Sequence, residues 1–234
     1  MSRLPPLALA IALALSPVLP AAAAEGAPVA APVPDARLHA LFDADWERSL
    51  RDNPLIATYL GDPRYNDLLP DVSSAAVKQR QDATRASLAT LLAIDRATLS
   101  ANDQLNHDLY RQQLETDIAG FAFPTHLMPV SQQGGPHLLA VQMAPALRFE
   151  DTIDYIDWVE RLRAYGEFID FNIELMREGI AAGWVPPKAV MQRVPAQIAA
   201  QRVDLPEQSS FFSPLLEMNA QVPATEQARL REEA

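Results

Sequence analysis

The chain has 234 residues, of which 49% are hydrophobic and 21% are charged, so its composition is globular rather than disordered or collagen-like. The net charge of −11 and the lack of a Lys/Arg-rich run argue against nucleic acid as a partner, because such a surface repels phosphate backbones. Cysteine is absent, which excludes disulfides, a thiolate nucleophile, cysteine-bound metal and a lipid anchor on a processed cysteine.

The first 24 residues have the three-part organisation of a secretion signal. Arg3 gives a positive start, residues 4–19 are mostly apolar, and Ala22–Ala24 supply the small residues of a cleavage site. A transmembrane anchor is the alternative, but the apolar run is short and contains prolines. Residues 1–24 therefore predict a signal peptide, export to the periplasm or medium, and no stable membrane anchor after cleavage.

Residues 25–34 contain APVAAPVP, which predicts an extended Pro/Ala linker. A helix is expected from Asp35, since apolar residues then recur at three- and four-residue spacing. Asn53-Pro54 and Gly61 are start and stop signals for a short helix over residues 54–60. Residues 61–71 are rich in turn formers and predict an ordered loop. The expected inward residues of the first helix are Leu38, Leu41, Phe42 and Trp46.

Two longer helices are expected next. Ser73 or Ser74 can cap one that runs to about Ala97, and Ser100 can cap another that ends at Gly120. The predicted inward residues are Leu88, Leu91 and Leu92 in the former, and Leu105, Leu109, Leu114 and Ile118 in the latter.

Residues 121–147 form a predicted central loop, because four prolines and Gly134-Gly135 interrupt helical continuity. Loops of this length inside a domain are uncommon and often functional. Short extended segments are expected at residues 125–131 and 138–141.

The longest helix is expected to begin at Glu150-Asp151, where negative charge suits the helix dipole, and to end at Gly183. A further helix is expected over residues 186–203, kinked at Pro195, and a polar one at the end of the chain. Residues 35–234 thus predict an all-α, multi-helix bundle that forms the N-terminal part of a larger helical domain. The predicted inward stripe of the longest helix is Ile153, Ile156, Leu162, Ile169, Ile173, Met176 and Ile180, with Tyr155, Trp158, Phe168 and Phe171 on other sides.

No residue qualifies as catalytic or metal-binding from the sequence. The chain has no His-Glu-x-x-His, Gly-x-Ser-x-Gly or glycine-rich phosphate loop. His39 is expected to be solvated and His107 to be half-exposed on a helix. His126 and His137 share the central loop, but no neighbouring acid completes a metal site.

The central loop offers the one candidate ligand site. Gln133, Gly135 and His137 belong to a run in which glycine would let the backbone approach a ligand closely. The alternative is a structural turn between packed helices. A paired-acid site at Asp151, Asp154 and Asp157 is disfavoured, because their spacing suits a solvated helix face.

Four stretches, in order, resemble a bacterial family of unknown function, DUF885. They are residues 42–71 (FDADWERSLRDNPLIATYLGDPRYNDLLPD), residues 103–109 (DQLNHDL), residues 133–137 (QGGPH), and residues 177–187 with Arg-Glu-Gly-Ile, Gly183 and Pro186-Pro187. The resemblance implies a longer, mainly helical, exported protein similar to zinc metallopeptidases. The zinc-binding His-Glu segment of such proteins lies downstream of the matched stretches, so zinc is expected only in a longer parent protein.

Three possibilities remain open from the sequence. One is the N-terminal portion of an exported metallopeptidase-like protein, inert by itself, with a peptide as substrate and Gln133, Gly135 and His137 along the substrate groove. Another is a non-enzymatic helical binding module of the cell envelope. A third possibility is a degenerate relative of the metallopeptidase-like proteins that keeps the scaffold and has lost the chemistry.

Overall fold

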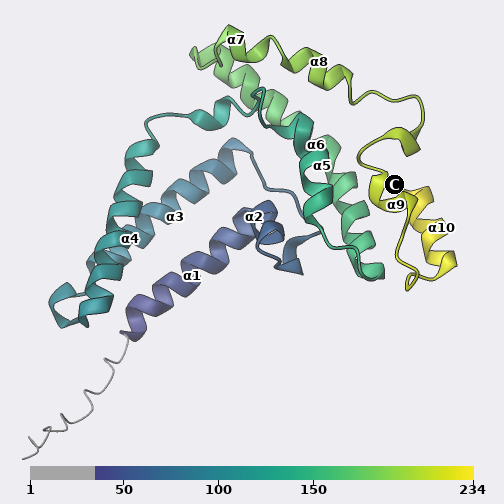
Figure 1. The fold of residues 1–234 in the computed structure, drawn as a ribbon. Helices are drawn as coiled ribbons and strands as arrows, with labels where there is room; N and C mark the ends of the chain where they lie inside the picture. The colour runs from purple at the N-terminus through teal and green to yellow at the C-terminus, as the bar shows by residue number, and fades with distance from the viewer. Residues whose placement is uncertain (1–34) are drawn as a thin grey trace, which may run out of the picture. The chain divides into compact units, whose positions relative to one another are not determined.

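The computed structural model describes residues 35–234, so the predicted signal peptide and linker lie outside the described residues. Helices and short 3₁₀ turns make up all the regular structure of this part of the chain, which contains no strand, and the all-α prediction is confirmed (Figure 1). None of its helices combines the length and apolarity needed to cross a membrane. The helices are α1 (Ala36–Asp52), α2 (Pro54–Tyr59), α3 (Ser74–Leu92), α4 (Ala101–Gly120), α5 (Leu139–Met143), α6 (Thr152–Ala182), α7 (Lys188–Met191), α8 (Val194–Ala199), α9 (Ser213–Leu216) and α10 (Ala224–Glu233).

Short polar side chains determine where the long helices begin. Asp35, Ser73 and Ser100 each accept a hydrogen bond from backbone N–H groups in the first turn of α1, α3 and α4. Asp151 does the same for α6 and forms a reciprocal capping box with an aspartate three residues later. Gly183 ends α6 with a φ of 77°, a left-handed conformation that glycine adopts without a Cβ clash.

The helix α3 ends at Leu92, five residues before the predicted end at Ala97. Asp95 explains the difference, because its carboxylate accepts from the N–H of Ala97 and starts a 3₁₀ turn instead of continuing the helix. The turn buries Ile94, which is 6% exposed, against the first core.

Three other expectations about the second half are wrong. Residues 125–131 and 138–141 form no strands. Thr125–Leu127 is a 3₁₀ turn and residues 128–131 have no regular structure, while Leu138 ends the 3₁₀ turn Pro136–Leu138 and residues 139–141 begin α5. The helix expected over residues 186–203 is two short helices, α7 and α8. Pro195 lies in the first turn of α8, where a missing N–H is tolerated, so the chain breaks just before the proline instead of kinking there.

The first hydrophobic core lies between α1, α3 and α4. Its two fully buried residues, Leu38 and Leu91, come from α1 and α3, and each contributes roughly 1.5–3 kcal/mol by leaving water. Leu114 is the buried leucine of α4, and Phe42 packs edge-on against Tyr110 at the border of this core.

The second core gathers around the N-terminal half of α6. Tyr155, Trp158 and Val159 are at most 2% exposed and pack against α5, α9 and α10. The indole N–H of Trp158 donates to the carbonyl of Phe211 at 2.9 Å, so the buried ring keeps its polar atom satisfied.

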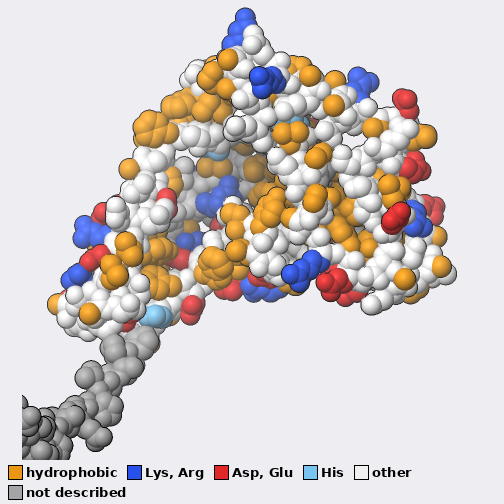
Figure 2. Space-filling model, in the orientation of Figure 1, with side chains coloured by type: hydrophobic (Ala, Val, Ile, Leu, Met, Phe, Trp, Pro, Cys, Tyr) orange, Lys and Arg blue, Asp and Glu red, His pale blue; other side chains and the backbone are white. Residues whose placement is uncertain are grey.

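Several residues predicted to point inward are exposed instead. On α4, the inward positions belong to Asp103, His107 and Leu114, which follow helical spacing on the side facing α1 and α3. On α6, Tyr155, Trp158 and Phe168 are buried, whereas Phe171 and most isoleucines of the predicted stripe are not. The predicted inward residues that are more than a third exposed are Trp46, Leu92, Leu105, Leu109, Ile153, Ile173 and Ile180, and Figure 2 shows that hydrophobic side chains reach the surface at many places.

Candidate functional site

A cavity of about 630 Å³ lies between the C-terminal half of α6 and the segment that carries α7 and α8. Ile169, Ile173 and Met176 line it from α6, while Val194 and Ile198 line it from α8. A volume of this size is typical of small-ligand sites, which are mostly apolar with a few polar groups. This cavity is therefore the candidate ligand site.

The central loop reaches the cavity through His137, which belongs to the lining. Nε2 of His137 lies 3.3 Å from Oε1 of Gln197 on α8, and Nε2 of Gln197 donates to the carbonyl of Gln132 at 2.9 Å. Because Gln197 uses its N–H toward Gln132, its oxygen accepts from His137, which is then protonated on Nε2. This pair joins the loop to α8 across the cavity.

The backbone conformation of Gly135 sets the direction of the central loop. Its φ is 137°, and a methyl group added there would lie 2.7 Å from the carbonyl oxygen of Pro129 and 3.3 Å from Nδ1 of His137. The buried Nδ1 has no hydrogen-bond partner among the described residues. Nearby, the hydroxyl of Tyr165 donates to the carbonyl of Pro136, and burial raises the pKa of Tyr165 to about 12. Only glycine at position 135 allows the loop backbone to lie this close to the carbonyl of Pro129.

The three residues predicted for a substrate groove take different places. His137 lines the cavity, Gly135 shapes the turn behind it, and Gln133 is exposed outside the lining. The carbonyl of Gln133 accepts from the side chain of Gln142 at 3.3 Å. The structure thus brings one of the three side chains to the cavity and gives the glycine a conformational role.

The other histidine of the central loop is His126, which is half-buried. No group of three or more His, Asp or Glu side chains suitable for a metal ion occurs in residues 35–234. Burial lowers the pKa of His126, while the charge of Glu178 opposes that shift. His39 was expected to be solvated but pairs with Asp103, whose Oδ1 lies 2.9 Å from its Nε2. The pKa of Asp103 is lowered, mainly by this hydrogen bond.

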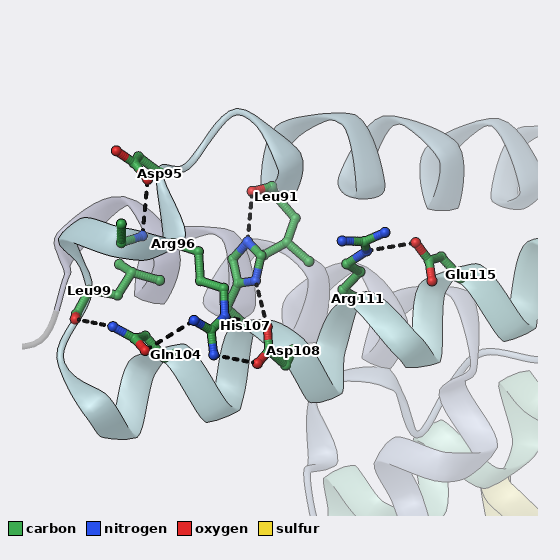
Figure 3. Close-up of polar contacts among 10 residues, drawn as sticks. Leu91, Asp95, Arg96, Leu99, Gln104, His107, Asp108, Arg111 and Glu115 are labelled. Carbon is green, nitrogen blue, oxygen red and sulfur yellow. Dashed lines mark hydrogen bonds and ion pairs between the residues drawn. The ribbon is translucent and has the colours of Figure 1, made fainter.

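The prediction that His107 is half-exposed is wrong, since it is 4% exposed within α4. Figure 3 shows its ring between the two helices, with Nε2 3.3 Å from the carbonyl of Leu91 at the end of α3. Nδ1 of His107 lies 3.6 Å from Oδ1 of its neighbour Asp108, which also accepts two hydrogen bonds of 2.7 Å from Arg96. His107 therefore connects α4 to the end of α3.

The acidic run at the start of α6 is more structured than predicted. Asp151 and Asp154 form the capping box, and Oδ2 of Asp154 accepts from two backbone N–H groups. Asp157 is half-buried, and its pKa is raised, first by burial and then by the charge of Asp67. Two of the three carboxylates are thus occupied with backbone groups, which leaves no pair for acid–base chemistry.

Arg161 is the main buried charge that sequence reasoning missed. Its side chain is 2% exposed, and Nη2 donates to Oγ1 of Thr58 at 3.1 Å and to the carbonyl of Tyr65 at 2.8 Å. Nε and Nη1 are buried without a partner among the described residues. Burial lowers its pKa to about 10, although Asp67 and Asp157 oppose the shift. Arg161 anchors the ordered loop after α2 to α6.

The cavity-lining residues were visible in the sequence only as core residues. Ile169, Ile173 and Met176 belong to the apolar stripe predicted for α6, and an apolar stripe alone cannot distinguish a core from a cavity wall. Five prolines from residue 186 to residue 214 were the available signal, because they keep the facing segment from forming one continuous helix.

Comparison with known families decides the relationship. Residues 54–234 match the family described as "Bacterial protein of unknown function (DUF885)". The chain belongs to the DUF885 family. The match covers the ordered loop after α2, the central loop and the whole cavity, so the candidate site lies within the DUF885 region. A search of curated proteins found no match to this chain.

Proposed function

We propose that residues 35–234 form the peptide-binding helical part of an exported, metallopeptidase-like protein. The observation that carries the proposal is the apolar cavity between α6 and α8, with His137 of the central loop in its wall. An apolar cavity with amide groups beside it suits a peptide, which presents apolar side chains on a neutral amide main chain. The resemblance of the four sequence stretches to metallopeptidase-like proteins supports the reaction class.

Peptide hydrolysis of this type needs zinc to polarise the scissile carbonyl and to activate water, with a glutamate as base. The sequence offers no His-Glu-x-x-His for that purpose. We therefore propose that this chain binds and orients the substrate and that the zinc ligands belong to a longer parent protein. By itself the chain is then inert as a peptidase.

The test compares the 234-residue chain with the protein purified from its own cells. The chain alone should retain no stoichiometric zinc and should cleave no peptide in a mixed fluorogenic library. The protein from its own cells should have a larger intact mass, hold one zinc and cleave peptides in a chelator-sensitive way. Chelator-sensitive cleavage by the chain alone would contradict the proposal.

A different result would favour the non-enzymatic reading. If the protein from its own cells has the mass of this chain after signal removal, binds peptides and cleaves none, it is a helical binding module of the cell envelope. The cavity would then still bind the ligand, but the metallopeptidase assignment would be dropped.

A further inference from the structure

The charge of the cavity wall limits what can enter. Among the described residues, those that line the cavity include no Asp, Glu, Lys or Arg. A charged group placed there would lose its hydration without gaining an ion-pair partner, which is strongly unfavourable. The occupant is therefore an uncharged group. A fatty acid or a phospholipid head group fits poorly, because no cation in the wall would bind its carboxylate or phosphate.

The polar side chains among the described lining residues are those of His137, Tyr165, Asn172 and Gln201. Gln197 lies on α8 and bonds to His137 and to the carbonyl of Gln132, both in the central loop. Primary amides carry both donors and acceptors, which is what a peptide main chain requires. Gln201 is the lining amide that can bond to a peptide main chain. The amide of Asn172 already donates to the carbonyl of Phe168, and that of Gln197 already bonds to the central loop.

The size and flexibility of the wall indicate how much it can accept. The volume of about 630 Å³ has room for one large side chain together with part of its main chain. Met176 and Met191 lie in the wall, and methionine adapts its shape more readily than branched residues do. The wall thus selects a class of side chains rather than one residue type.

We infer that this cavity is a specificity pocket for one large, uncharged, apolar side chain, aromatic or long aliphatic, of a bound peptide. The inference rests on the proposed function, because it names the part of the peptide that the cavity recognises. The peptide main chain passes along Gln201, and the side chain enters between Ile173 of α6 and Ile198 of α8.

The test measures binding of peptides by the protein purified from its own cells. The peptides are blocked at both ends and differ at one position, which carries Phe, Leu, Ala, Asp or Lys. Full burial of a large apolar side chain should make the Phe and Leu peptides bind roughly 10- to 100-fold more tightly than the Ala peptide. The Asp and Lys peptides should bind no better than the Ala peptide.

Two matched variants of α6 locate the effect. Ile173→Trp fills the cavity from its wall and should abolish the preference for Phe and Leu. Ile180→Trp is the control, since Ile180 lies on the same helix, is 67% exposed and is not part of the lining. Ile173→Ala enlarges the cavity and should shift the preference from Phe toward Trp, a change that mere structural damage would not produce.

The outcomes separate this inference from the proposed function. Peptide binding without side-chain preference, or with a preference that Ile173→Trp leaves intact, overturns the specificity pocket and leaves peptide binding standing. Failure to bind any peptide overturns both. Binding of a fatty acid that Ile173→Trp abolishes and Ile180→Trp preserves would show a lipid site and would overturn the inference.

Discussion

Arg161 gives the sharpest test of how the fold is held together, because its charge is buried without an ion pair. Replacing it with Met keeps most of the side-chain volume and removes the charge, while replacing it with Ala also empties the space. The two hydrogen bonds that would be lost run to Thr58 and to the carbonyl of Tyr65.

The two opposing contributions are similar in size. Hydrogen bonds from a charged donor contribute about 1.5–3 kcal/mol each, so the pair is worth roughly 3–6 kcal/mol. Burial lowers the pKa of Arg161 from its ordinary value to about 10, which corresponds to about 3 kcal/mol against the charged form. Arg161→Met should therefore lower the free energy of unfolding by roughly 0–3 kcal/mol. Arg161→Ala should lower it by about 2 kcal/mol more, because it also leaves a cavity.

The free energy of unfolding is measured by urea titration, with far-UV circular dichroism as the signal. The slope of this free energy against urea concentration must be the same in all variants. A loss well above about 4 kcal/mol for Arg161→Met would refute the reasoning, because the buried charge would then be strongly stabilising overall. Equal losses for Met and Ala would also refute it, since packing would then contribute nothing.

Gly135→Ala should destabilise the fold by about 1–3 kcal/mol, because Gly135 has a positive φ and lies close to the carbonyl of Pro129. Gly134→Ala is the control and should be nearly neutral, because the added methyl group would meet open space. Equal effects of the two substitutions in thermal unfolding would contradict this prediction. Burial lowers the pKa of His126 below its ordinary value of 6.5, so the unfolded chain takes up a proton first as the pH falls. The stability that neutral His126 contributes should thus be complete above pH 6.5 and be lost below it. His126→Asn should remove this part of the pH dependence of the free energy of unfolding, and an unchanged pH dependence in the variant would contradict the assignment. Asp151→Ala removes the cap of α6 and should cost about 1 kcal/mol in urea unfolding, and a loss below a few tenths would show that the capping box is dispensable.

Local chemistry explains why the helix starts could be predicted. The sequence predicts Ser73 or Ser74 and Ser100 as caps, because a short polar side chain can bond the free N–H groups of a first turn in any surroundings. It also predicts helix starts at Asp35 and at Glu150-Asp151, and the structure shows that Asp35 and Asp151 are the caps there. Gly183 could be predicted as the end of α6, because ending a helix in a left-handed conformation depends on the glycine backbone alone.

Inward faces could not be predicted so well, because several helices are apolar on more than one side. Leu105 and Leu109 looked like the inner face of α4, yet Asp103 and His107 take those positions. The reason is tertiary: Asp103 accepts from the backbone N–H of Asp35 and pairs with His39, both distant in sequence. A polar residue is favoured inside once such partners are present.

The sequence by itself therefore determined the all-helical class and the main helix starts, since both depend on contacts between near neighbours. Only the tertiary structure decided which helix faces are buried, that Arg161 holds the loop after α2, and that the stripe of Ile169, Ile173 and Met176 lines a cavity. These features depend on segments up to about a hundred residues apart, and periodicity within one helix does not encode which distant surface will face it.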